Sequence, residues 1–173
     1  AVVETVDKSM EQNAMSMPEN VNHFILLPAF AKRNYAELVA AQPTFVTESN
    51  TAGHNVYTRG AKPEKAIVTT GIAYNYLMEN YDPAMGCSIL RITQYPLPTA
   101  LIEQMVQDGA KEILVIEEGQ PVVEELIRGM VPSNIVIKGR LTGDLPRMGE
   151  LTPDSVRLAL GLAALPTHEP EAI

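Results

Sequence analysis

The chain has 173 residues, of which 46% are hydrophobic and 20% are charged, a composition typical of a globular domain. This length suits one ordinary hydrophobic core. The formal net charge of -8 argues against nucleic acid as a ligand, because phosphate binding needs an excess of Lys and Arg. The single cysteine, Cys87, excludes an internal disulfide, a cysteine-based zinc site and a cysteine-ligated iron–sulfur cluster within this chain.

The first residues form a polar approach to a domain. The sequence starts at Ala1 and runs through the polar stretch EQNAMSMPENVN, which is typical of a linker. We therefore assign residues 1–28 to a lead-in and expect the chain to be a fragment of a larger protein. No signal-peptide pattern opens the sequence, and no apolar run approaches the roughly 20 residues that span a bilayer. We expect a soluble protein of the reducing cytoplasm with no membrane partner.

Residues 29–60 predict a helix followed by a short strand, both packed on the domain that follows. Residues 29–42 have a helix-forming composition. Their loose apolar face contains Phe30, Leu38 and Val39. Residues 44–60 are polar and show little periodicity, but Val56 and Tyr57 are a candidate edge strand.

Four short runs rich in β-branched residues predict the strands of a parallel sheet. They start at residues 67, 89, 113 and 135, so they recur every 22 to 24 residues, which is the length of chain that a βαβ crossover needs. Three of the runs are almost continuously apolar, as expected for strands buried on both faces. The runs are 67–70, 89–93, 113–116 and 135–137.

The segments between these runs have helical spacing. A short helix is expected after Gly71 and before Pro83. Two further helices are expected behind Pro98 and Pro121, because the fixed φ of proline suits the first helical position and apolar residues recur on one face. These apolar residues are Leu101, Ile102, Met105 and Val106 in the first helix, and Val122, Val123, Leu126, Ile127 and Met130 in the second.

Charges and caps support the helices nearer the C-terminus. Glu124 and Glu125 lie near the positive start of their helix, where acidic side chains interact favourably with the helix dipole. The last helix has the clearest start signal, with Thr152 as its N-cap and Pro153 in its first turn. We expect this helix to end near Pro166.

Together these elements predict a three-layer α/β/α sandwich. The main domain spans residues 61–166 and contains a mostly parallel sheet joined by right-handed crossovers. Helices must cover both faces of such a sheet. A short tail follows at residues 167–173.

The candidate site residues follow the strands, because ligands of open α/β sheets bind at the carboxyl ends of the strands. Thr70 and Gly71 follow the first run and are typical of either an anion-binding nest or a tight strand-to-helix turn. We favour the turn, since a single glycine does not make a dinucleotide-binding fingerprint. Tyr95 follows the second run, and Glu117 and Gln120 follow the third.

Glu117 and Glu118 are adjacent, so at the end of an extended strand they point to opposite faces and cannot form a facing acid–base pair. We expect a solvated strand end with one carboxylate near the N-terminus of the following helix. The three histidines lie far apart in the sequence and do not predict a metal site. Asp144 lies in a loop rich in Gly and Pro, where turn chemistry explains it. No nucleophile elbow, Walker loop or H-E-x-x-H helix is present.

Four motifs occur in a fixed order along the chain: a strand ending Thr-Thr-Gly, a Tyr-Pro-Leu-Pro turn, a Val-x-Glu-Glu turn, and a closing Pro-Arg-x-Gly-Glu-Leu-Thr-Pro signature. They occupy residues 69–71, 95–98, 115–118 and 146–153. With this order and spacing, the stretch from Ala66 to Leu162 resembles the middle of the large (alpha) subunit of indolepyruvate ferredoxin oxidoreductase. The upstream segment HFILLPAFAKRNYAEL is also similar to that subunit.

The resemblance implies a thiamine diphosphate-dependent enzyme that oxidatively decarboxylates aryl 2-oxoacids to acyl-CoA and passes electrons through 4Fe–4S clusters to ferredoxin. The similar part of that subunit is its transketolase C-terminal-like domain, whose five-stranded mixed sheet has one antiparallel edge strand. Val56 and Tyr57 would form that strand here. Thiamine diphosphate, Mg and the clusters would be bound outside this chain, so the resemblance assigns no catalytic, cofactor-binding or metal-binding residue to it.

Two hypotheses follow for the function. The first is an accessory domain that assembles with the adjoining thiamine-binding domains and the small (beta) subunit, and whose isolated chain is inactive. The second is a binding module that holds a small CoA-like ligand at the carboxyl edge of the sheet. The candidate interface or ligand edge is formed by Thr70, Gly71, Tyr95, Glu117 and Gln120.

Overall fold

The computed structural model describes residues 16–166, which divide into two compact units. The first unit lies within residues 1–42 and the second within residues 43–173, so the division falls inside one helix. Each unit is described below by itself.

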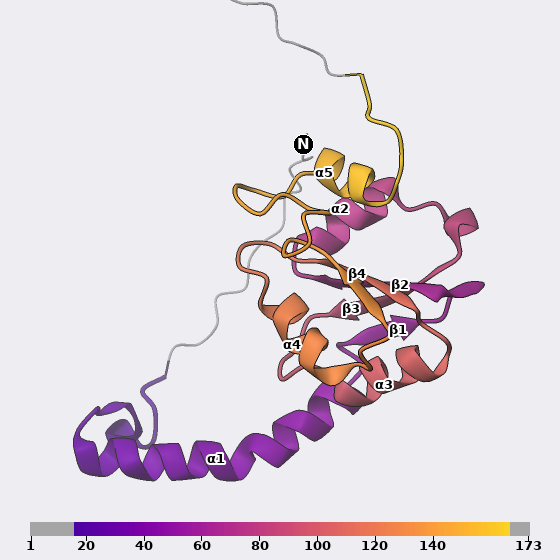
Figure 1. Ribbon diagram of the computed structural model, residues 1–173. Coiled ribbons are helices and arrows are strands. Elements are labelled where there is room, and N and C mark those ends of the chain that lie inside the picture. The colour runs from indigo at the N-terminus through magenta and orange to yellow at the C-terminus, as the bar shows by residue number, and fades with distance from the viewer. Residues whose placement is uncertain (1–15, 167–173) are drawn as a thin grey trace, which may run out of the picture. The chain divides into compact units, whose positions relative to one another are not determined.

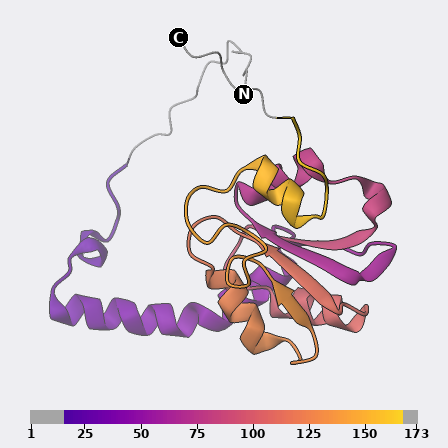
Figure 2. The same ribbon diagram turned by 45° about the horizontal axis from the view of Figure 1, so that its top comes forward.

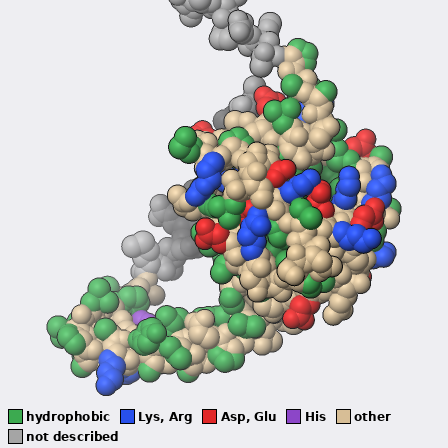
Figure 3. Space-filling view, viewed as in Figure 1, with side chains coloured by type: hydrophobic (Ala, Val, Ile, Leu, Met, Phe, Trp, Pro, Cys, Tyr) green, Lys and Arg blue, Asp and Glu red, His purple; other side chains and the backbone are tan. Residues whose placement is uncertain are grey.

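The first unit contains a short 3-10 helix, η1 (Val21–Phe24), and the greater part of helix α1 (Pro28–Thr51). The helix predicted at residues 29–42 is confirmed. Many apolar side chains of this unit, in α1 and in the residues before it, lie on its surface (Figure 3). The large exposed ones include Phe24, Leu26, Leu27, Tyr35, Leu38 and Val39.

Helix α1 extends beyond its predicted end, through Pro43 to Thr51. The polar residues of this last part bond back to the helix backbone, since Thr47 donates to the Pro43 carbonyl at 3.0 Å and Asn50 donates to the Val46 carbonyl at 2.7 Å. Such bonds satisfy short polar side chains inside a helix. This part of the helix has little apolar periodicity, so its extension to Thr51 could not be predicted from the sequence.

A five-stranded sheet forms the centre of the second unit. Its strand order is β1-β3-β2-β4-β5, and β1 pairs antiparallel with β3 while all other pairs are parallel. The four predicted runs are therefore strands of one parallel sheet, and the predicted antiparallel edge strand is also present. The strands are β1 (Val56–Thr58), β2 (Lys62–Thr70), β3 (Cys87–Ile92), β4 (Glu112–Ile116) and β5 (Val136–Lys138).

Helices cover both faces of the sheet, which confirms the three-layer α/β/α sandwich (Figures 1 and 2). Helices α2 (Ala73–Asn80) and α5 (Pro153–Ala159) lie on one face. Helices α3 (Thr99–Gln107) and α4 (Val122–Met130) lie on the other. A short 3-10 helix, η2 (Pro83–Met85), precedes β3.

Each face of the sheet has its own hydrophobic core. Side chains alternate between the two along β2, where Val68 joins the core under α3 and α4 and Ile67 joins the core under α2 and α5. The first core is the larger one, and its fully buried members include Leu90, Met105, Ile113, Val115 and Ile127. The second includes Ala73, Leu77, Ile116, Leu145, Leu151 and Val156.

Three further helix boundaries differ from the predicted ones. Pro98 and Pro121 occupy the N-cap positions of α3 and α4, one residue before the first helical turn. Helix α5 ends at Ala159 and does not reach Pro166. Gly161 has a φ of 76° and closes the helix in a Schellman motif, in which Leu162 N–H donates to the Arg157 carbonyl at 3.1 Å.

Candidate functional site

The carboxyl ends of β3, β2 and β4 lie side by side, because these strands are parallel neighbours. The structure therefore brings the predicted candidates Thr70, Gly71, Tyr95, Glu117 and Gln120 to one edge of the sheet. Among the described residues, no hydrogen bond joins any two of these five. They occupy the same edge without forming a single cluster.

Glu117 is buried at the end of β4, and its carboxylate caps the start of α4. It accepts the backbone N–H groups of Val123 at 2.9 Å and Glu124 at 2.8 Å. This confirms the carboxylate expected near the following helix N-terminus. The expectation that this strand end is solvated is wrong for Glu117, which is 4% exposed, because its carboxylate turns inward to bond the start of α4. Burial raises the pKa of Glu117 above its ordinary value, although the two N–H groups oppose this shift and favour the charged form.

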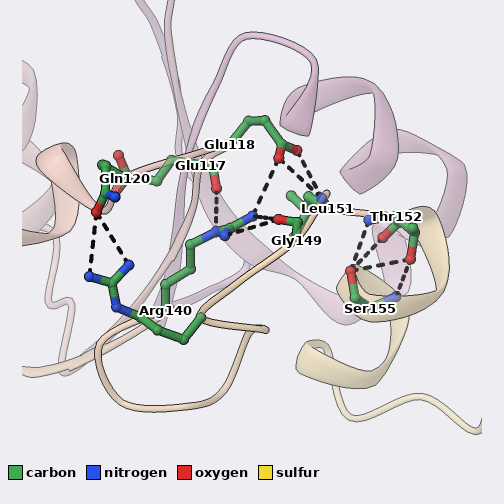
Figure 4. Close-up of polar contacts among 9 residues, drawn as sticks. Glu117, Glu118, Gln120, Arg140, Gly149, Leu151, Thr152 and Ser155 are labelled. Atoms are coloured by element: carbon green, nitrogen blue, oxygen red, sulfur yellow. Dashed lines mark hydrogen bonds and ion pairs between the residues drawn. The ribbon is translucent and has the colours of Figure 1, made fainter.

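Glu118 points to the opposite face of the sheet from Glu117, as predicted. Its carboxylate accepts the N–H of Leu151, at 3.0 Å to Oε2 and 3.1 Å to Oε1 (Figure 4). Leu151 precedes helix α5, whose predicted N-cap, Thr152, accepts the N–H of Ser155 at 3.2 Å. The two adjacent acids thus attach chain segments from the two different helical layers to the end of one strand.

Arg140 completes this arrangement and was not singled out by the sequence. Its side chain is buried, and its Nε donates to the Glu117 carbonyl oxygen at 3.0 Å. Its terminal nitrogens lie 3.5 Å from the Gly149 carbonyl oxygen and 3.5 Å from Glu118 Oε1 (Figure 4). One guanidinium therefore connects the end of β4 to the loop of residues 139–151, which we call the closing loop.

Glu124 is the second buried charge that sequence analysis missed. It lies in the first turn of α4, as expected for an acid near the positive start of a helix, and its relative exposure is 0%. Its carboxylate accepts from Arg128 at 2.7 Å and from the N–H of Leu141 at 3.0 Å. A side chain at Gly139 would overlap Glu124 Oε2, so glycine is required where the closing loop passes this carboxylate.

The turn after β2 has the geometry of a strand-to-helix turn. Gly71 has a φ of 53°, in the left-handed region that favours glycine. Its carbonyl accepts the N–H of Tyr74 at 3.2 Å. The space around a Cβ at this position is open, so backbone conformation rather than crowding accounts for the glycine.

Tyr95 lies in the turn after β3, with a cis peptide bond to Pro96. The residue is 57% exposed, and burial of the remainder, together with the charge of Glu117, raises the pKa of its hydroxyl. Asn55, which the sequence did not single out, holds this turn. Its amide oxygen accepts the N–H groups of Thr93 at 2.8 Å and Gln94 at 2.9 Å.

Gln120 borders a hollow of about 520 Å³ between the β4–α4 turn and the closing loop. Its amide oxygen lies 3.4 Å from both terminal nitrogens of Arg147. The other lining residues are Gly119, Arg140, Met148 and Gly149. The exposed Arg147 of this hollow therefore bonds, among the residues that the structure describes, to a neutral amide alone.

The donor set at this edge does not fit a magnesium–diphosphate group. Such a group needs carboxylate or carbonyl oxygens that converge on one point, whereas Glu117 and Glu118 are bonded to backbone N–H groups on opposite faces. In residues 16–166, no three His, Cys, Asp or Glu side chains come together as a possible metal-ligand set. Within the same residues, no helix has both the length and the apolar character needed to cross a membrane.

Over nearly its whole length, the chain is similar to proteins described as indolepyruvate oxidoreductase subunit IorA. It is 27% identical to the protein of Methanothermobacter thermautotrophicus in an alignment of 177 residues. This alignment covers 98% of the present chain and 28% of the Methanothermobacter protein. It is 28% identical to the protein of Pyrococcus abyssi in an alignment of 141 residues. This alignment covers 78% of the present chain and 21% of the Pyrococcus protein.

The chain spans little more than a quarter of the length of the curated relatives it matches. No family model and no solved structure matches it significantly. The resemblance inferred from the four motifs is confirmed: the chain is similar to one part of an indolepyruvate oxidoreductase subunit.

Proposed function

We propose that this chain is an accessory domain of a thiamine diphosphate-dependent oxidoreductase that oxidatively decarboxylates aryl 2-oxoacids such as indolepyruvate to acyl-CoA. Its role there is assembly: the carboxyl edge of the sheet docks on adjoining thiamine-binding domains and on the small (beta) subunit. The observation that carries this proposal is the closing loop, which Arg140, Glu118 and Glu124 attach to the end of β4 and to α4.

A loop held in this way makes a good interface because little conformational entropy is lost when it docks. Arg140 and Glu124 are fixed inside the domain, while Met148 at the tip of the loop is 86% exposed. Leu141 is also exposed on this loop. Apolar side chains presented on a stiff polar frame are typical of the core of a protein interface.

The cofactors are assigned to other parts of the larger subunit. Thiamine diphosphate, when bound, supplies the electron sink for decarboxylation, and 4Fe–4S clusters carry the electrons to ferredoxin. The single cysteine of this chain cannot hold such a cluster, and the acids of the candidate edge are already bonded to backbone N–H groups. We place the enzyme in the cytoplasm, where a reducing environment suits iron–sulfur chemistry.

Two measurements test this proposal. The purified chain, titrated calorimetrically with thiamine diphosphate and Mg²⁺ and assayed for dye reduction with indolepyruvate, should give neither saturable binding nor turnover. In the full-length subunit, Arg140→Met should loosen the closing loop and reduce association with the small subunit in light-scattering measurements. Arg59→Gln, which removes a surface ion pair to Asp108, is the matched control and should leave association unchanged. Turnover by the isolated chain, or normal association of the Arg140→Met subunit, would refute the assembly role.

The hollow beside Gln120 favours a second candidate function, the binding of a CoA-like ligand. Arg147 is exposed there and makes no ion pair among the described residues, so it is available for a phosphate group. Calorimetric titration of the chain with CoA separates the two functions. Saturable binding that Arg147→Gln abolishes would establish a ligand site, and no binding would leave the hollow as part of the docking surface.

A further inference from the structure

Arg91 occupies an unusual position on the face of the sheet that carries α2. It lies on β3, whose residues alternate between a fully buried face and a half-buried one, and Arg91 is on the half-buried face. Its Nε is buried and has no hydrogen-bond partner. Among the described residues, its guanidinium makes no hydrogen bond or ion pair, and the contact it does make is with the face of the Tyr74 ring, 5.0 Å from the ring centroid.

The surroundings of Arg91 are apolar and open. A hollow of about 380 Å³ lies over this part of the sheet. Its floor is formed by β1 and β3, because Val56 is the register partner of Arg91 and their side chains share one face. Its wall is a stripe of α2 and the residue just after it, Tyr74, Met78 and Tyr81, which recur at helical spacing. Ile89 completes the floor.

A cation in such a place lacks the compensation that buried charges normally have. Most other arginines of the described chain are paired with acids, as Arg128 is with Glu124 and Arg59 with Asp108. Arg147 and Arg157 have no acidic partner there, but each bonds to neutral amide or carbonyl oxygens, which Arg91 does not. Asp82 follows the wall of the hollow in sequence, but its carboxylate accepts the N–H of Ala84 at 2.8 Å. The hollow therefore combines an apolar contact surface with a positive charge that, among the described residues, has no acidic partner.

We propose that this hollow is a docking site for an acidic and apolar segment of another polypeptide, in which a carboxylate pairs with Arg91 and a neighbouring apolar side chain fills the space beside Met78. Charge complementarity selects the carboxylate, and the lining selects the apolar neighbour. The edge position of β1 selects a polypeptide, because the outer side of an edge strand offers unpaired backbone groups to an extended chain (Figure 1). This hollow shares no lining residue with the hollow beside Gln120, and the inference does not depend on the assembly proposal.

The test is a titration of the isotopically labelled chain, followed by NMR. The probes are a blocked pentapeptide with a central aspartate between two phenylalanines, flanked by alanines, and its asparagine counterpart. The aspartate peptide should shift the amide signals of Val56, Tyr74 and Met78 and bind about tenfold more tightly, because a charge-assisted hydrogen bond distinguishes the two peptides.

Variants of Arg91 show whether its charge is responsible. Arg91→Met should reduce binding of the aspartate peptide to the level of the asparagine peptide, while Arg91→Lys should keep most of the preference. Arg59→Gln is the matched control and should keep all of it. The proposal is overturned if the unchanged chain binds both peptides equally, if neither binds at millimolar concentration, or if the shifts lie elsewhere. It is also overturned if 3-phenylpropionate binds as tightly as the aspartate peptide, since the hollow would then be a small-molecule site.

Discussion

Replacing Glu124 by alanine tests whether the buried carboxylate holds the closing loop. The change removes the acceptor of the Leu141 N–H, and leaving such a group unpaired costs about 1–3 kcal/mol. The lost pairing with Arg128 costs less than about 1 kcal/mol, because that side chain is 38% exposed and water replaces its partner. Loss of a buried methylene adds about 0.8 kcal/mol. We expect a total loss of about 2–4 kcal/mol in the free energy of unfolding.

The measurement is urea unfolding followed by far-ultraviolet circular dichroism, because the chain has no tryptophan to report by fluorescence. Glu124→Gln keeps the volume and one acceptor oxygen, so it should cost about 1 kcal/mol. The matched control is Glu125→Ala, an exposed acid in the same helical turn, which should change stability by less than about 0.5 kcal/mol. If Glu124→Ala and Glu125→Ala have equal stability, the carboxylate does not hold the loop.

Three further changes test other parts of the structure. Burial raises the pKa of Glu117 above its ordinary 4.5, so its charged form destabilises the fold. The stability of the unchanged chain relative to Glu117→Gln should therefore fall as the pH rises above 4.5, and a rising difference would contradict this sign. Asn55→Ala should lower the free energy of unfolding in urea by about 2–4 kcal/mol, since it removes four hydrogen bonds from a buried amide. The control is Asn75→Ala at an exposed position, and a loss for Asn55→Ala no greater than that of the control would contradict the role of Asn55. Gly139→Ala should lower the free energy of unfolding by about 1–3 kcal/mol through overlap with Glu124. Gly129→Ala, which meets open space in α4, should not lower it, and equal effects of the two changes would refute the crowding at Gly139.

The sequence predicts the sheet well because its central strands are buried on both faces. Ile113, Leu114 and Val115 all lie in one core or the other, so the β4 run has to be continuously apolar. Such a run can be recognised in the sequence without knowing which strands lie beside it. The helices on each face are read from one apolar stripe. The end of α5 was not predicted correctly. Its Schellman motif depends on the positive φ of Gly161, and a glycine in the sequence does not by itself show that its φ is positive.

The candidate site was predicted only in part, for a physical reason. Glu117 and Glu118 were assigned to opposite faces correctly because the alternation of a strand is a local property. Arg140 and Glu124 are defined by contacts with loops more than ten residues away, such as Arg140 with Glu117 and Glu124 with Leu141. The one local signal that was available is the i,i+4 pair of Glu124 and Arg128, which is usually a solvated surface pair.

The buried charges are concentrated at the carboxyl edge and hardly occur elsewhere in the described cores. Glu117, Glu124 and Arg140 all lie in the β4–α4–β5 crossover or directly after it. Burying charges is a poor way to gain stability, because apolar residues of similar size often stabilise a fold at least as well. What paired charges add is geometry: each bond fixes where one segment of the closing loop lies relative to β4. An edge held by paired charges therefore has a fixed shape, which is the property that the proposed docking would require and that burial of apolar residues alone would not provide.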